Sequence, residues 1–197
     1  MALPSDKIEP VSPKAQLRTE MRRRLKAVTP AELATASARL CEAVRAHEFW
    51  SGARSIGLFH GLARLGEPDL AELMEVERAF AYPRLAPTGV MEFCLVRQLV
   101  ELTLQEIALP DGKRLSLVQP DPRLPAMDLT ELGLVLVPGL AFTREGQRLG
   151  RGGGFYDRLL ARLSPPTHTL GVALGCQLVP DLPVEPHDRM LDGVIVA

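Results

Sequence analysis

The stretch LGLVLVPG, residues 132–139, decides the fold of this chain. A short, continuous apolar run that ends at a proline and a glycine is typical of a strand buried on both faces of a sheet. After a loop, a helix is expected from about Gly154 to Leu163. A buried strand that leads into a helix is typical of βαβ units, so this stretch predicts a mainly parallel sheet.

Further strands and helices are predicted on both sides of this stretch. Apolar residues recur every four positions over 14–27, which predicts a helix, and the segment Thr29-Pro30-Ala31-Glu32 is a capping box that begins a second one, ending near His47. Glu67-Pro68 begins another predicted helix, which ends near Arg78. Strands are predicted at 55–60, 79–83, 91–96, 169–174 and 193–196, whereas 97–130 contain turn signals without a clear pattern.

The order of these elements predicts an α/β fold. Strands that alternate with helices indicate a single domain over residues 14–197, in which a mainly parallel sheet has helices on both faces. A length of 197 residues is suited to one domain. Residues 1–13 contain three prolines and few apolar side chains, so we expect a mobile leader there.

The composition argues against several classes of function. The chain is 46% hydrophobic and 24% charged, with a formal net charge of −1, so its overall charge does not favour nucleic acid or an anionic membrane. No apolar run is long enough to span a bilayer, and the N-terminus lacks the apolar core of a signal peptide. Three widely separated cysteines indicate neither a disulfide framework nor a zinc site. We expect a cytoplasmic monomer without nucleic-acid or membrane partners.

The segment RLGRGGGFYDR, residues 148–158, is the most informative one for function. Its four glycines allow backbone N–H groups to turn towards an anion at the start of a helix. Arg148 and Arg151 have guanidinium groups suited to phosphate oxygens, and Asp157 can hold a Mg²⁺ ion that bridges phosphates. The segment is neither a Walker motif nor a Rossmann fingerprint. It predicts phosphate binding; the alternative is a flexible loop before an ordinary helix.

Two other charged motifs have ordinary explanations when they are considered alone. Lys14 and Arg18 lie four residues apart and point the same way from one helix, which suits a polyphosphate but is more often a solvated basic face. A helix that binds nucleic acid is weakened as an alternative by the neutral net charge. His187-Asp188 follows several prolines and acids, where an aspartate is usually a turn residue.

Together, these motifs resemble the 5-formyltetrahydrofolate cyclo-ligase family. The segment VPGLAFTREGQRLGRGGGFYDRLL, residues 137–160, is similar to the signature of that family. The pair Lys14 and Arg18 matches the family as well. Two further matches are Tyr82-Pro83-Arg84, followed by Met91-Glu92-Phe93, and residues 184–188, followed by Asp192. The matches extend over roughly residues 14 to 196, in the order found in the family.

The resemblance implies ATP-dependent cyclisation of 5-formyltetrahydrofolate to 5,10-methenyltetrahydrofolate, with release of ADP and phosphate and with Mg²⁺ as the metal ion. It implies catalytic roles for Arg151 and Tyr156, and Mg²⁺ ligands at Asp157 and Asp188. The predicted ATP-binding residues are Lys14, Arg18, Arg148, Gly150, Arg151, Gly152, Gly153, Gly154, Phe155 and Tyr156. The predicted substrate-binding residues are Phe59, Arg64, Arg151, Gly152, Gly153, Gly154 and Phe155.

One position departs from the family pattern. The family often has a glutamate after its first strand, in contact with the pterin ring, and here Arg64 aligns with it while Glu67 is expected to cap the next helix. Either Glu67 reaches the site, or the folate lies differently, or the substrate has changed. The alternatives are therefore a non-catalytic relative that binds folate or nucleotide, and an ATP-dependent ligase for a different small acid.

Overall fold

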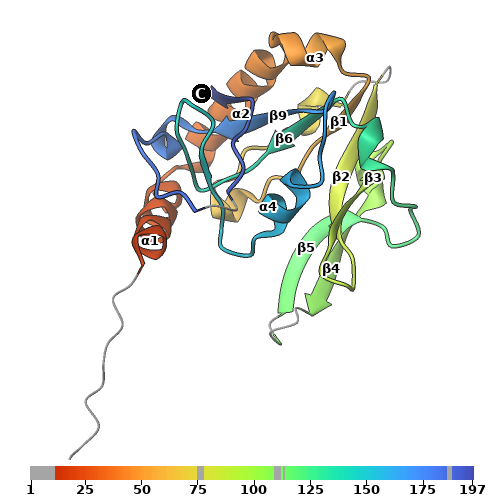
Figure 1. Ribbon diagram of the computed structural model, residues 1–197, viewed down its shortest axis with the longest axis horizontal. Helices are drawn as coiled ribbons and strands as arrows, with labels where there is room; N and C mark the ends of the chain where they lie inside the picture. Colours follow the sequence, from red (N-terminus) through yellow and green to blue (C-terminus); the bar gives the residue numbers. More distant parts are fainter. Residues whose placement is uncertain (1–11, 75–77, 109–111, 113, 186–187) are drawn as a thin grey trace, which may run out of the picture.

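A six-stranded sheet forms the centre of the protein, with strand order β10-β9-β6-β1-β2-β3 (Figure 1). This computed structural model describes residues 12–74, 78–108, 112, 114–185 and 188–197. Neighbouring strands are parallel except for the antiparallel pair of β2 and β3, which confirms the predicted, mainly parallel sheet. The strands are β1 (Ser55–Gly57), β2 (Ala79–Leu85), β3 (Met91–Leu95), β6 (Leu134–Val137), β9 (His168–Ala173) and β10 (Gly193–Val196).

Strand β6 explains why the stretch at 132–139 is continuously apolar. It lies between β1 and β9, and all of its residues are buried. Leu134 and Leu136 belong to one hydrophobic core, whereas Val135 and Val137 belong to a second core on the opposite face. Because successive side chains of a strand point to opposite faces, a strand covered on both sides needs apolar residues at every position.

Helices cover both faces of the sheet, as predicted. Trp50 of α3 and several apolar residues of α1 and α2 pack into the core that contains Leu134, while Leu159 and Leu160 of α4 pack into the core that contains Val135. The long helices lie together on one side of the sheet and the short α4 on the other (Figure 1). These helices are α1 (Pro13–Lys26), α2 (Pro30–Arg45), α3 (Glu48–Gly52) and α4 (Phe155–Leu160).

The predicted helix starts are confirmed for α1 and α2. The Thr29 N–H donates to Glu32 over 2.8 Å, and the Glu32 N–H donates to the Thr29 hydroxyl over 3.3 Å, which completes the capping box. Helix α1 begins at Pro13, with Ser12 as its N-cap, so these two residues belong to the helix start. The rest of the predicted leader, residues 1–11, lies outside the described part of the chain.

Two helix predictions need correction. In the described part of the chain no α-helix follows Glu67; the segment forms only the 3-10 turn Ala71–Leu73, and another 3-10 turn, Ala63–Leu65, precedes Glu67. Asp69 Oδ1 accepts the Ala71 N–H over 2.9 Å and closes a local turn there. Residues 75–77, also in the predicted helix, lie outside the description. Helix α4 ends at Leu160, before the predicted Leu163, since the N–H groups of Arg162 and Leu163 bond three residues back in tighter turns.

The stretch 97–130, which has no clear pattern in the sequence, contains an antiparallel hairpin. Strands β4 (Leu102–Ala108) and β5 (Arg114–Pro120) form a separate two-stranded sheet, and this hairpin projects from the main sheet (Figure 1). A second small pair, β7 (Ala141–Phe142) and β8 (Arg148–Leu149), precedes the glycine-rich segment. The remaining 3-10 turns are Leu99–Glu101, Leu129–Glu131 and Gly175–Gln177. Among the described residues, no helix has the length and apolar character needed to cross a bilayer.

Candidate active site

A cavity of about 1000 Å³, the large cavity, opens at the carboxyl ends of the parallel strands. Phe59 and His60 line it just after β1, Pro83 and Leu85 near the end of β2, and Gly139 after β6. This is where ligands bind in open α/β sheets. The loop after β1, which was predicted to border the site, lines this cavity, and the binding roles of Phe59 and Arg64 stay predictions.

A smaller cavity of about 250 Å³ adjoins the large one. Four residues of the glycine-rich region line both cavities: Arg148, Gly150, Gly154 and Asp157. The small cavity is completed by residues from distant parts of the chain, and the predicted residues divide between the two. Lys14, Arg18, Gly152 and Asp188 line only the small cavity, whereas Phe59, Arg64, Arg151, Gly153, Phe155 and Tyr156 line only the large one.

Lys14 is buried in the small cavity and is not part of a solvated basic face. It is 8% exposed, and its Nζ lies 2.7 Å from Asp188 Oδ2 and 2.9 Å from Glu185 Oε2. Burial acts to lower the pKa of Lys14, but the hydrogen bonds with Asp188 and Glu185 outweigh it, so the pKa is raised. Lys14 is therefore a fixed positive charge at neutral pH.

Helix α1 also holds the backbone of the glycine-rich loop. Arg18 Nε donates to the carbonyl of Gly150 over 3.0 Å, and an Arg22 nitrogen donates to the carbonyl of Arg151 over 3.1 Å. Sequence reasoning assigned no role to Arg22, although it continues the four-residue spacing of Lys14 and Arg18. These bonds explain why α1 and the loop, far apart in sequence, form one site.

The glycines of the loop are required by its backbone conformation. Gly152 has φ +108° and Gly154 has φ +66°, angles that other residues adopt only with strain. Gly154 is the N-cap of α4. Since α4 spans only 6 residues, its dipole adds less to anion binding than the predicted longer helix would.

Arg148 lies between the two cavities. Its side chain is 3% exposed and forms an ion pair with Asp157, while its Nη1 donates to the carbonyl of Pro138 over 3.3 Å. The guanidinium also lies 5.7 Å from the centre of the Tyr156 ring. Arg148 is thus held in place from three sides, and its partner Asp157 is one of the two predicted Mg²⁺ ligands.

Although Arg64 aligns with the glutamate of the family, Glu67 brings a carboxylate to the wall of the large cavity. Its Oε1 lies 2.8 Å from Arg151 Nε and 2.7 Å from an Arg151 Nη, and Arg151 also donates to the carbonyl of Leu65 over 3.3 Å. Glu67 Oε2 accepts the N–H of Leu62 over 3.1 Å. Arg64 is exposed in the same cavity wall, with no ion-pair partner among the described residues.

Tyr156 presents a buried hydroxyl that has no hydrogen-bond partner among the described residues. Burial raises the pKa of this phenol, the charge of Glu67 raises it further, and Arg148 opposes both. The group is therefore protonated at neutral pH. An unpaired buried hydroxyl in a cavity wall is suited to a polar group on a ligand.

The wall formed by the β4–β5 hairpin was not predicted from the sequence. Its contribution includes Leu104 and the whole segment from Arg114 to Gln119. The signal that could have revealed the hairpin is the alternation of apolar and polar residues on both sides of the turn sequence Pro110-Asp111-Gly112.

The fold and the site define a class of protein: a single-domain α/β protein whose ligand cavities lie at the carboxyl ends of parallel strands, with a glycine-rich loop and paired charges between them. The family model of the 5-formyltetrahydrofolate cyclo-ligase family matches residues 10–197. The chain is 30% identical over 195 residues to the 5-formyltetrahydrofolate cyclo-ligase of Mus musculus, and the matched region covers 93% of each of the two chains. The Escherichia coli enzyme of the same name is 44% identical over 79 residues, 38% of this chain and 43% of that protein.

Two solved structures share the fold. The 5,10-methenyltetrahydrofolate synthetase of Aquifex aeolicus has a TM-score of 0.73 and 22% identity, with 93% of this chain and 89% of that chain covered. The corresponding synthetase of Mycoplasma pneumoniae has a TM-score of 0.70 and 19% identity, with 93% and 98% covered. The chain belongs to the 5-formyltetrahydrofolate cyclo-ligase family, and it is accordingly an enzyme of the ligase class.

Proposed function

We propose that the protein uses ATP to cyclise 5-formyltetrahydrofolate to 5,10-methenyltetrahydrofolate, with release of ADP and phosphate. The observation that carries the proposal is the pair of adjoining cavities that share the glycine-rich loop. The small cavity, lined by charged groups, suits a triphosphate, and the large cavity suits the folate. The loop between them is where the reacting groups of the two substrates meet.

The charges of the small cavity support a triphosphate with a metal ion. Lys14 and Arg148 are each paired with a carboxylate, Asp188 and Asp157 respectively. A triphosphate with Mg²⁺ carries both signs of charge, so Lys14 and Arg148 would bind its oxygens, and Asp157 and Asp188 would then be available to hold the metal ion. Bare phosphate would leave these carboxylates next to like charge, which explains a requirement for the metal.

The residues present fit Mg²⁺ in the chemistry of their donors. Asp157, Glu185 and Asp188 bring carboxylate oxygens to the small cavity, and such oxygens are the ligands that Mg²⁺ prefers. The described residues contain no cluster of three or more side chains that could hold a metal by themselves, so phosphate oxygens and water would complete the coordination. When bound, Mg²⁺ supplies neutralisation of phosphate charge.

The large cavity combines an apolar surface with a few polar groups, as binding sites for ring compounds do. Phe59, Leu85 and Leu117 are among its apolar residues. Arg151, fixed by Glu67, and the Tyr156 hydroxyl are polar groups of the same cavity. This arrangement suits a pterin ring with its N5-formyl group directed towards the glycine-rich loop.

The proposed reaction has two steps. The formyl oxygen attacks the γ-phosphorus of ATP, so that ADP leaves and the oxygen becomes part of a phosphate leaving group. N10 of the folate then attacks the formyl carbon and releases its proton to water, and phosphate departs as the ring closes. Arg148 and Arg151 neutralise charge that develops on the phosphoryl group, the loop N–H groups bind its oxygens, and Tyr156 donates a hydrogen bond.

The direct test is the absorbance of methenyl-folate after mixing the protein with 5-formyltetrahydrofolate, ATP and Mg²⁺, with ADP measured in parallel. We expect product and ADP in equal amounts, and no product when ATP or Mg²⁺ is omitted. Binding of both substrates without any product would instead identify a non-catalytic relative, and ADP release with another small acid would identify a different ligase.

A further inference from the structure

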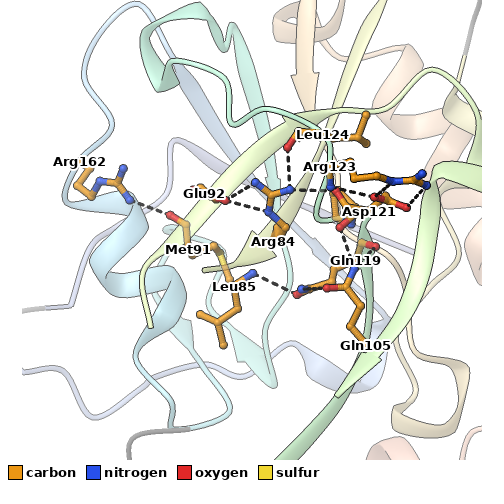
Figure 2. A network of polar contacts seen from close by, with 11 residues as sticks. Arg84, Leu85, Met91, Glu92, Gln105, Gln119, Asp121, Arg123, Leu124 and Arg162 are labelled. Carbon is orange, nitrogen blue, oxygen red and sulfur yellow. Dashed lines mark hydrogen bonds and ion pairs between the residues drawn. The ribbon is translucent and has the colours of Figure 1, made fainter. Parts of the chain in front are cut away.

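Gln119 connects the β4–β5 hairpin with the central sheet. It is 4% exposed, and its Oε1 accepts a hydrogen bond of 3.1 Å from the backbone N–H of Leu85, the last residue of β2. Figure 2 shows this contact at the centre of a larger polar network. Gln119 and Leu85 both line the large cavity, so their hydrogen bond lies in its wall.

The end of β1 explains why Leu85 needs such a partner. Strand β1 pairs with β2 only as far as Ala81, and the carbonyl of Ala81 accepts the Leu58 N–H over 2.8 Å. Beyond Ala81, the backbone groups of every second residue of β2 point towards the side of β1, where β1 no longer provides partners. Pro83 has no N–H to offer there, and the N–H of Leu85 is the next buried donor, which Gln119 satisfies.

The orientation of the Gln119 amide follows from its partners. The Leu85 N–H can only donate, so the Gln119 oxygen must face it. Gln119 Nε2 donates to Gln105 Oε1 over 2.8 Å, and Gln105 Nε2 donates to Thr103 Oγ1 and to the carbonyl of Pro120, both over 2.9 Å. The Gln119 amide therefore links β2 by hydrogen bonds to both strands of the hairpin, to β5 through Gln119 itself and to β4 through Gln105.

Arg84, the neighbour of Leu85 in β2, binds the chain after β5 (Figure 2). Its Nη1 donates to the carbonyls of Asp121 and Leu124 over 3.0 and 2.8 Å, and Glu92 accepts from its Nε over 2.8 Å. The Arg84 side chain is 12% exposed. The chain at the end of β5 is thus bonded to two consecutive residues of β2, Arg84 and Leu85.

The hairpin contributes to one cavity only. Leu104, Leu115 and Leu117 line the large cavity, and Leu104 is 72% exposed, so its side chain is available to cover a ligand. No hairpin residue lines the small cavity among the described residues. A shift of the hairpin therefore changes the space for the ring compound and leaves the triphosphate cavity as it is.

We infer that Gln119 is a positioning residue for the folate: through Leu85 it holds the hairpin at the distance that the ring system requires, without a role in ATP binding. This inference rests on the proposed function, because it assigns the folate to the large cavity. Gln119 acts through the position of Leu104, Leu115 and Leu117, and not by taking part in either chemical step.

The test is calorimetric binding of each substrate alone to Gln119→Met, which keeps the length of the side chain and removes the acceptor. We expect the Kd for 5-formyltetrahydrofolate to rise about tenfold, the effect of one lost buried hydrogen bond, and the Kd for ATP with Mg²⁺ to remain within about twofold. The matched control is Arg123→Ala, which removes a nearby surface ion pair with Asp121 and should change neither affinity. Gln105→Met removes the hydrogen bond that holds the Gln119 amide and keeps the bond of Gln119 with Leu85. It should raise the folate Kd by less than Gln119→Met does, and it provides the same test if Gln119→Met does not fold.

Two outcomes separate this inference from the proposed function. In the first outcome, the wild-type protein binds both substrates, but Gln119→Met and Gln105→Met either keep both affinities or lose folate and ATP affinity equally. This result overturns the positioning role and leaves the proposed function in place. Wild-type protein that binds no folate overturns the proposed function, and the positioning role with it.

Discussion

Three cations of the site are each paired with a carboxylate: Lys14 with Asp188, Arg148 with Asp157, and Arg151 with Glu67. Pairing lowers the cost of holding a charge away from water, and it fixes each guanidinium or ammonium group in one position. A cation held in this way needs little reorganisation when charge develops on a phosphoryl group. At the scale of single residues, the account therefore depends on preorganised cations.

Arg151→Ala tests that dependence. We expect kcat/KM for methenyl-folate formation to fall about 10²- to 10³-fold, as when one preorganised donor to a developing charge is removed. The measurement is the initial rate of methenyl-folate absorbance with ATP and Mg²⁺. Arg144→Ala is the matched control, since Arg144 is exposed and lines neither cavity, and it should keep full activity. Activity near that of wild type in Arg151→Ala would refute the role of Arg151.

At the scale of elements, the β7–β8 turn places the glycine-rich loop next to the C-terminal segment. Gly146 lies in this turn with φ +94°, and a Cβ there would lie 2.3 Å from the carbonyl oxygen of Leu191. The carbonyl of Gly146 accepts the Leu191 N–H over 2.9 Å. Both the conformation and the close approach require glycine, so this one position joins the β7–β8 turn to the segment that precedes β10.

Gly146→Ala is accordingly expected to destabilise the protein by about 3 kcal/mol, from backbone strain and the collision with Leu191. Urea unfolding followed by circular dichroism measures the change. Gly52→Ala provides the contrast, because a Cβ at Gly52 meets no atom within 4 Å; its effect should stay within about 1 kcal/mol. Equal stability of the two variants would show that the turn tolerates a side chain.

Elements also show what the sequence could and could not predict. The strand at 134–137, the capping box at Thr29 and the glycine-rich segment were predicted because their signals lie within a few consecutive residues. The ion pair of Glu67 with Arg151 spans 84 residues, and Glu67 is followed by a 3-10 turn where an α-helix was expected. The hydrogen bond of Gln119 with Leu85 was also missed because it joins residues far apart in the sequence. It forms where β2 continues beyond its last pair with β1, at Ala81.

At the scale of the whole molecule, several buried groups make the fold sensitive to alkali. Burial, with a smaller contribution from Glu72, raises the pKa of the Cys41 thiol from 9.0 to about 11. Burial also raises the pKa values of Cys94 and Tyr82. These groups ionise more easily in the unfolded chain. As the pH rises above the unfolded thiol pKa, the unfolded state therefore loses protons first and gains stability relative to the folded state.

The free energy of unfolding should consequently fall between about pH 8 and pH 10. The raised pKa of Lys14 lowers the stability only at higher pH, above its ordinary pKa of 10.5, where the unfolded chain releases the proton that the folded state still holds. Urea titrations at the two pH values measure the difference, and Cys41→Ala should make the decrease smaller. Stability that is unchanged or higher at pH 10 would contradict this account of the core.

The central claim is that the formyl oxygen of the folate is the atom that accepts the phosphoryl group at the glycine-rich loop. The most direct measurement is a single reaction with 5-formyltetrahydrofolate labelled with ¹⁸O in the formyl group, in which the released phosphate is analysed by mass spectrometry. We predict that each phosphate carries one labelled oxygen, in step with methenyl-folate and ADP. Label in water, with unlabelled phosphate, would show that ring closure proceeds without phosphorylation of the substrate.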